Sequence, residues 1–198
     1  MLSLQRLELE GFGPFADRQV LEIPTQPGIT LVYGENMRGK TSLLNAVRYA
    51  FYGQVLGRGS RERRLHTITN RDLATRGQYG FKVSLSFTSD GQEYQLIRSC
   101  RPLAGRSVPT DDSHYEQDVM LRQGDSILGP GERDGVLSRA LPDQISRFFL
   151  FDGELLQEYE KLLYEDDDDG RKISQSIEQI LGVPILKRIL DTTFACGI

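Results

Sequence analysis

The stretch LVYGENMRGKTSLLNAVRYAFYG, residues 31–53, decides the fold of this chain. It contains the pattern G-x-x-x-x-G-K-[ST] from Gly34 to Thr41. An apolar run over 28–34 precedes the pattern and predicts a buried central strand. Apolar residues at helical spacing follow it and predict a helix that is closed by Gly53 as a C-terminal cap. A strand, this loop and a helix, in that order, are the context of a phosphate-binding P-loop.

The chemistry of this loop follows from its backbone. Glycines let several N–H groups point at the phosphates of a nucleotide, and the helix N-terminus adds its dipole. We expect Lys40 to bridge the β- and γ-phosphates of ATP, and the Thr41 hydroxyl to coordinate Mg²⁺. The predicted nucleotide-binding residues are Gly34, Asn36, Met37, Arg38, Gly39, Lys40, Thr41 and Ser42.

The composition is that of an ordinary globular protein. The 198 residues are enough for one well-packed domain. Of them, 38% are hydrophobic and 26% are charged, as in globular proteins. No apolar run approaches the roughly 20 residues of a membrane span, and the N-terminus lacks a signal-peptide core. We therefore expect a cytoplasmic protein with no membrane partner. Its two cysteines, Cys100 and Cys196, lack metal-type spacing and fit reduced thiols.

Alternating apolar and polar residues predict antiparallel strands around the P-loop. The expected elements are strands over 4–12 and 18–23, a hairpin over 79–100 that turns at Asp90-Gly91, a hairpin over 115–128, a short helix over 131–142 and an apolar strand leading into Asp152. The expected fold class is α/β, a P-loop domain with a mixed sheet and antiparallel hairpins. Beyond residue 155 the pattern is helical, and Asp166–Asp169 predict a solvated loop.

Positive charge gathers in one predicted loop. The net charge is −4, yet residues 57–77 carry six Arg against one Glu and one Asp. Because Arg makes bidentate contacts to phosphate, such a loop can face nucleic acid, although a solvated loop has the same composition. The candidate DNA-binding residues are Arg58, Arg61, Arg63, Arg64 and Arg71.

Three segments carry a resemblance to a known family: LQRLELEGFGPF (4–15), the P-loop stretch over 31–53, and VSLSF with DGQEYQLIR (83–87 and 90–98). Together they resemble the N-terminal half of the ABC-type ATPase heads of the SMC/RecF/SbcC family. That family splits its head in sequence, so the resemblance implies an N-terminal lobe over 1–155 and a helical segment over 156–198 that leads to a coiled coil. LPDQISRFFLFDGELL (141–156) and SIEQILGVPIL (176–186) most resemble the DndD group, the ATPases of DNA phosphorothioate modification.

The resemblance also implies partners. These are a C-terminal lobe of the same head, a second head in an ATP-dependent dimer, DNA, and other components of a DNA sulfur-modification complex. Two positions depart from the family pattern: Arg38 stands where relatives often have a small residue, and Gly11 stands where they often have Asn. The departure at Gly11 removes any expectation of base or ribose contacts from an Asn side chain there.

The carboxylates after the apolar run at 148–151 have three interpretations. Asp152 and Glu154 form a Walker B pair that holds magnesium and polarises the attacking water, or Asp152 occupies the family's Q-loop position as a sensor of magnesium and water, or the stretch is a core strand closed by an Asp-Gly turn. We favour the sensor, because no L-S-G-G signature precedes the stretch and the sequence predicts no strand after it. On that interpretation the chain by itself binds nucleotide poorly or modestly and hydrolyses it very slowly.

Three functions therefore remain open. The first is an ATP-driven DNA-processing head, in phosphorothioate modification and linked defence or, alternatively, in DNA repair. The second is a nucleotide-gated interaction protein without DNA contact, which the net negative charge supports. The third is a self-sufficient phosphotransferase, which requires the Walker B interpretation.

Overall fold

The computed structural model describes residues 2–26, 28–35, 39–57, 62–105, 108–143, 146 and 149–150. The chain divides into two units, Met1–Ser146 and Arg147–Ile198. Of the second unit only Phe149 and Leu150 are described, and the elements from β1 to α3 all belong to the first unit. No helix within the described residues is long and apolar enough to cross a membrane.

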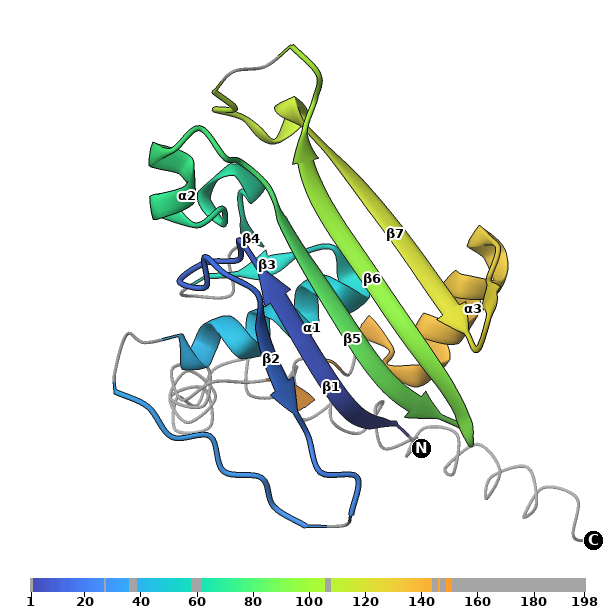
Figure 1. The fold of residues 1–198 in the computed structure, drawn as a ribbon. Coiled ribbons are helices and arrows are strands. Elements are labelled where there is room, and N and C mark those ends of the chain that lie inside the picture. Colours follow the sequence, from blue (N-terminus) through green and yellow to red (C-terminus); the bar gives the residue numbers. More distant parts are fainter. Residues whose placement is uncertain are drawn as a thin grey trace, which may run out of the picture. The chain divides into compact units, whose positions relative to one another are not determined.

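A six-stranded sheet in the order β2-β1-β5-β6-β7-β8 forms the body of the first unit (Figure 1). All of its neighbouring strands pair antiparallel. Its strands are β1 (Ser3–Glu10), β2 (Gln19–Glu22), β5 (Phe81–Ser89), β6 (Gln92–Pro102), β7 (Tyr115–Gln123) and β8 (Ser126–Ile127). The remaining elements are α1 (Lys40–Tyr52), β3 (Val55–Leu56), β4 (Glu62–Arg63), η2 (Leu65–Thr67), α2 (Arg71–Thr75), η3 (Asp112–His114) and α3 (Pro130–Ala140).

Local turn chemistry explains the longest hairpin. Asp90 and Gly91 both have positive φ angles, 51° and 77°, as a two-residue turn between strands of right-handed twist requires. The turn sets the register of β5 against β6, in which Phe87 faces Tyr94 and Phe81 faces Cys100. The predicted hairpins, the P-loop helix with its Gly53 cap and the short helix before Pro142 are confirmed.

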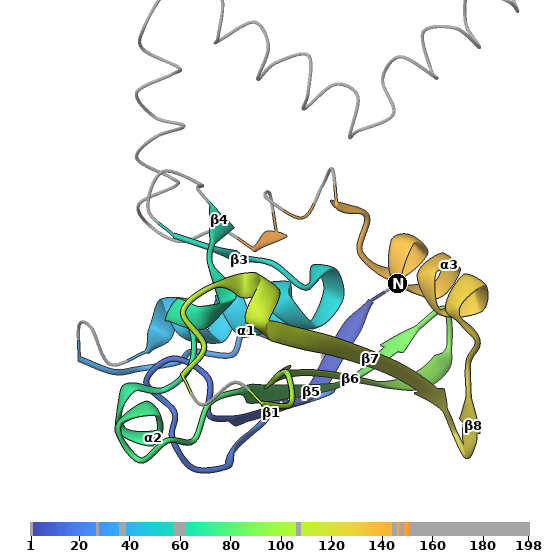
Figure 2. The ribbon, with the colours of Figure 1, turned by 90° about the horizontal axis from the view of Figure 1, so that it is seen from above.

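The core lies between one face of the sheet and α1, and Figure 2 shows α1 and α3 on the same face. Period-two alternation places the apolar residues of each strand on that face. Phe12, Tyr49 and Phe81 meet there, with ring centroids 5.1 to 5.9 Å apart. Cys100 is buried beside them as a free thiol, and burial raises its pKa to about 12, so it is neutral at physiological pH.

The prediction of a buried strand over 28–34 is wrong. This segment forms no strand, and it runs away from the sheet (Figure 1). Ile29 is 91% exposed and Tyr33 is 85% exposed. A strand that is apolar on both faces needs partners to pair and cover it, and within the described residues no strand pairs with this segment. The mixed sheet expected from it is accordingly antiparallel throughout its described part.

The prediction of a strand leading into Asp152 is also wrong at the positions that can be compared. Ser146 and Phe149 are helical, and the Ser146 N–H donates to the Pro142 carbonyl over 3.1 Å. A segment without a sheet neighbour satisfies its backbone groups within itself. Asp152 and Glu154 lie outside the described residues, as does the predicted loop at Asp166–Asp169.

Candidate nucleotide-binding site

Gly39 joins the phosphate loop to α1 in a conformation that favours glycine. Its φ angle is 104°, in the region that L side chains rarely adopt. A Cβ atom built on Gly39 would lie 2.8 Å from Phe15 Cζ and 3.0 Å from Pro14 Cγ. Backbone angle and close approach therefore both require glycine at the end of the loop.

Lys40 begins α1 and turns back across the loop. Its Nζ donates to the Gly34 carbonyl over 2.7 Å, so the first and last parts of the P-loop motif are brought together. Thr41 and Ser42 follow in the first turn of α1, which has no acidic residue and no side-chain cap at its N-terminus. The helix dipole and the Lys40 ammonium group thus place positive charge where a phosphate is expected.

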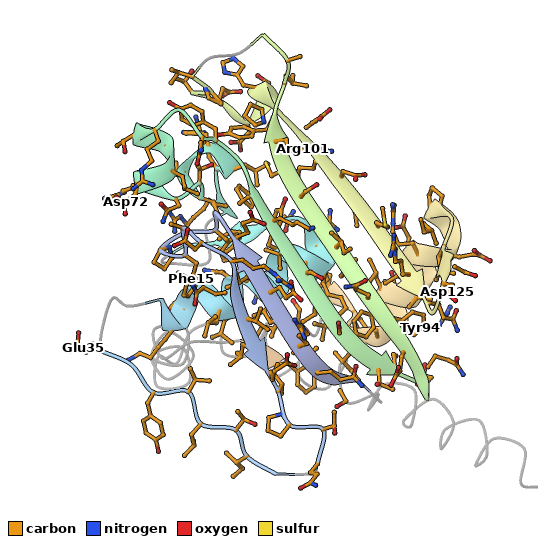
Figure 3. The ribbon with its side chains drawn as sticks, viewed as in Figure 1. Phe15, Glu35, Asp72, Tyr94, Arg101 and Asp125 are labelled. Carbon is orange, nitrogen blue, oxygen red and sulfur yellow. The ribbon has the colours of Figure 1, made fainter. Side chains whose placement is uncertain are left out.

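A hollow of about 240 Å³ lies beside the loop. Gly34, Gly39 and Lys40 border it, and its walls include the side chains of Phe15 and Leu43. Figure 3 shows Phe15 beside the first turn of α1 and Glu35 at the end of the segment 28–35. Residues of β1 and β2, among them Leu7, Leu9 and Leu21, line most of the rest of the hollow, so it adjoins the start of α1 but is mostly apolar.

A cation from the sheet holds the other end of α1. Arg98, on β6, donates from Nε to the Ala50 carbonyl (3.1 Å) and from Nη2 to the Phe51 carbonyl (3.3 Å). Its guanidinium carbon lies 5.9 Å from the centre of the Tyr49 ring. Burial lowers the pKa of Arg98, but the group stays charged, and its charge complements the negative end of the helix dipole.

The residue that follows α3 is also attached to α1. The Tyr52 hydroxyl donates to the Leu141 carbonyl over 2.8 Å. Arg48, which is 6% exposed, donates to the Ser146 hydroxyl over 3.4 Å. The helix that begins at Lys40 therefore packs against both the sheet and the segment that precedes residue 147.

The structure brings together one part of the predicted site. Gly34, Gly39, Lys40, Thr41 and Ser42 are described and lie together. Seven further predicted residues lie outside the described residues: Asn36, Met37, Arg38, Arg58, Arg61, Asp152 and Glu154. No group of three or more His, Cys, Asp or Glu residues within the described part could hold a metal ion. Thr41 stays the candidate magnesium ligand of that part.

Arg63, Arg64 and Arg71 are exposed. They are distant from Lys40 in sequence, but the segment that carries them packs against the loop between β1 and β2, where Thr69 forms an antiparallel β-bridge with Phe12. Sequence patterns did not identify Phe15, Asn70 or Arg98, because their partners are distant in the chain. The Gly-Pro-Phe in 13–15 was the one local signal of a tight turn near the site.

Comparison with known proteins places this geometry in a family. The profile of a family described as AAA domain matches residues 6–195. The DNA double-strand break repair Rad50 ATPase of Thermoplasma volcanium is 25% identical over 194 residues, which cover 96% of this chain and 20% of that protein. The Rad50 ATPase of Halobacterium salinarum is 34% identical over 106 residues, covering 54% of this chain and 11% of that protein.

A third relative is the DNA replication and repair protein RecF of Moorella thermoacetica. It is 31% identical over 96 residues, which cover 48% of this chain and 23% of that protein. The chain thus spans about a fifth of the length of the Thermoplasma relative. Its antiparallel sheet with few helices agrees with the N-terminal lobe of an SMC-type head. The chain belongs to the AAA domain family, among the P-loop ATPases of SMC/RecF/SbcC type.

Proposed function

We propose that this chain is the ATP-binding half of an SMC-like ATPase head that acts on DNA in repair. The observation that carries the proposal is the bond from Lys40 Nζ to the Gly34 carbonyl at the uncapped N-terminus of α1. A phosphate group that replaced this carbonyl would meet the ammonium group and the helix dipole together. The names of the relatives supply the DNA repair context.

These relatives favour repair over phosphorothioate modification. The resemblance to the DndD group rests on residues 141–156 and 176–186, most of which lie outside the described residues. The Rad50 and RecF relatives are instead repair proteins, and the Thermoplasma protein matches across 194 residues. Repair is therefore the more specific function that we propose.

The exposed segment 28–33 supports the proposal that a C-terminal lobe completes the head. Its large side chains, Ile29, Leu31, Val32 and Tyr33, are 48 to 91% exposed. Adjacent apolar side chains in water are unfavourable and mark a surface that another element covers. Pairing with a strand of that lobe would create the central strand predicted for this segment.

Hydrolysis needs the groups of that lobe as well. Phosphoryl transfer requires a positioned water and stabilisation of developing charge beyond what a P-loop supplies. We propose that Asp152 senses magnesium and that the C-terminal lobe and a second head supply the rest. By itself the chain should bind Mg-ATP and turn it over very slowly.

DNA binding is tested by charge removal in residues 57–77, which we call the Arg-rich segment. Replacing Arg63, Arg64 and Arg71 with Ala should weaken binding to duplex DNA at low salt. The slope of log K against log [salt] is negative, and its magnitude should decrease by up to about 0.9 for each phosphate that these side chains no longer neutralise. Fluorescence anisotropy of a labelled duplex, with and without ATP, measures both quantities.

The control is a triple variant with the same loss of charge elsewhere. Arg101, Arg122 and Arg139 are exposed on β6, β7 and α3, and their replacement with Ala should leave the salt slope unchanged. Equal effects of the two triple variants would contradict a specific DNA-binding segment. ATP-dependent association with a protein and no DNA binding would instead favour a nucleotide-gated interaction protein.

A further inference from the structure

Asn70 ties the Arg-rich segment to the loop between β1 and β2, which we call the wall loop (residues 11–15). Asn70 is 4% exposed. Its Nδ2 donates to the Gly13 carbonyl over 2.9 Å, and its backbone N–H donates to the Gly11 carbonyl over 2.8 Å. A third hydrogen bond joins the same two segments: the Gly13 N–H donates to the Ile68 carbonyl over 2.7 Å.

The other half of the Asn70 amide starts α2. Its Oδ1 accepts from the Asp72 N–H (3.0 Å) and from the Leu73 N–H (3.1 Å), as an N-cap residue does. One buried side chain thus has two separable tasks: its oxygen caps a helix and its nitrogen holds the wall loop. Figure 3 shows Asp72 on α2 and Phe15 on the wall loop.

The wall loop in turn packs against the P-loop. Pro14 and Phe15 fill the space next to Gly39, within 2.8 to 3.0 Å of where a Cβ would stand. A Cβ on Gly13 would lie 3.6 Å from Ser42 Oγ, in ordinary van der Waals contact. At the base of the loop, Phe12 is 1% exposed in the aromatic core. Gly11 and Gly13 are therefore both hydrogen-bonded to residues 68–70, and Gly13 is the bonded residue next to Pro14 and Phe15.

We infer that Asn70 is a positioning residue for the nucleotide site. Through Gly13 it fixes Pro14 and Phe15, which support Gly39 in the conformation that begins α1 and directs Lys40. Without that support, nucleotide binding must itself fix Gly39 and Lys40 in this conformation. The free-energy cost of doing so lowers the affinity for the nucleotide. The inference rests on the proposed function, since the ligand is ATP.

Asn70→Asp separates the two tasks of the side chain. Aspartate is as good an N-cap as asparagine, so α2 keeps its cap. The substitution removes the donor and leaves an oxygen facing the Gly13 carbonyl oxygen, which should displace the wall loop. The control is Ala74→Gly, which destabilises the same helix and leaves the Asn70 side chain and its bond to Gly13 in place.

The experiment measures Mg-ATP affinity by titration calorimetry, at a temperature where circular dichroism shows both variants and the unaltered chain fully folded. Asn70→Asp should raise the Kd about tenfold, the effect of one lost hydrogen bond with a buried group left unpaired. Ala74→Gly should stay within about twofold of the unaltered chain. This pattern supports a positioning role.

Two results would overturn the inference while leaving the proposed function in place. One is an unchanged Kd in Asn70→Asp, and the other is an equal loss of affinity in Ala74→Gly, since then Asn70 would only stabilise α2. A failure of the unaltered chain to bind Mg-ATP would overturn the proposed function itself, and the inference with it.

Discussion

Gly39 has two separate reasons to be glycine, and they can be measured apart. Gly39→Ala must place a Cβ at a φ of 104° and within 3.0 Å of Phe15 and Pro14. Strain at a positive φ costs about 1 to 2 kcal/mol, and overpacking adds about 1 to 3 kcal/mol. We expect thermal unfolding to show a loss of stability equal to the sum of the two costs. We also expect Gly39→Ala to bind ATP more weakly.

The matched control for that variant is Gly77→Ala. Gly77 has a φ of 73°, and nothing lies within 4 Å of a built Cβ. It should therefore lose only the strain contribution, about 1 kcal/mol, with ATP binding intact. Equal losses of stability in the two variants would show that Phe15 and Pro14 move aside without cost.

Glu8 makes the stability of the sheet depend on pH. Arg18, 2.7 Å from Glu8 Oε2, and Arg6, 2.8 Å from Oε1, hold the pKa of Glu8 below its usual value. The folded state therefore favours the carboxylate. Its contribution is complete above the pKa of an unfolded Glu, about 4.3, and is lost as the pH falls through the lower folded pKa.

The unaltered chain should consequently be more stable than Glu8→Gln by about 0.5 kcal/mol at pH 7, the scale of partly exposed ion pairs. In urea titrations the difference should shrink as the pH falls below about 4.3, the pKa of an unfolded Glu, and disappear below the lower pKa of the folded carboxylate. Glu93→Gln, at an exposed glutamate of β6 with no ion pair among the described residues, is the control and should change stability at pH 7 by less than about 0.5 kcal/mol. A difference for Glu8 that grows in acid would contradict this assignment.

At the scale of elements, the C-terminal end of α1 depends on a cation from another strand. It has no basic residue in its last turn, and Arg98 from β6 supplies the charge and bonds the Ala50 and Phe51 carbonyls. Arg98→Met keeps much of the packing but leaves buried carbonyls unpaired, so we expect a loss of about 2 to 3 kcal/mol in urea unfolding.

Arg101→Met is the control on the same strand. Arg101 is exposed, and its contact with Glu116 is a 4.0 Å surface pair, so its removal should change stability by less than about 0.5 kcal/mol. A similar small change in Arg98→Met would mean that Arg98 does not stabilise the end of α1.

Elements with local signals were predictable, and those that depend on distant partners were not. The α1 helix is closed by Gly53 at a φ of 73°, and the β5–β6 hairpin turns at Asp90-Gly91, so both signals lie within the elements themselves. The segment 28–34 has the apolar run of a central strand, but a strand also needs neighbours, and its own residues cannot provide them.

The same distinction holds for the site. Lys40 and Thr41 were predictable because the P-loop is contiguous. Asn70 and Arg98 were not, because their partners lie 57 and 48 positions away. The roles predicted for Asp152 and Glu154 stay predictions.

At the scale of the whole molecule, the core lies on one face of the sheet. Residues 28–33, which precede the P-loop, lie outside this core. Ile29, 91% exposed, can therefore be replaced by Ser with a change of less than about 0.5 kcal/mol. Leu7 is 2% exposed, so Leu7→Ala should lower the free energy of unfolding by about 2 to 5 kcal/mol. Chemical denaturation of the two variants compares them directly, and a large loss for Ile29→Ser would restore the predicted buried strand.

The measurement that tests the central claim most directly is the Mg-ATP affinity of the chain beside that of Lys40→Ala. Lys40 is the one side chain that we place both at the start of α1 and on the phosphates. We predict that the unaltered chain binds Mg-ATP and that Lys40→Ala loses at least about tenfold in affinity, the scale of a charge-assisted hydrogen bond. Equal affinities, or no binding by either, would contradict the account of this chain as the nucleotide-binding half of an ATPase head.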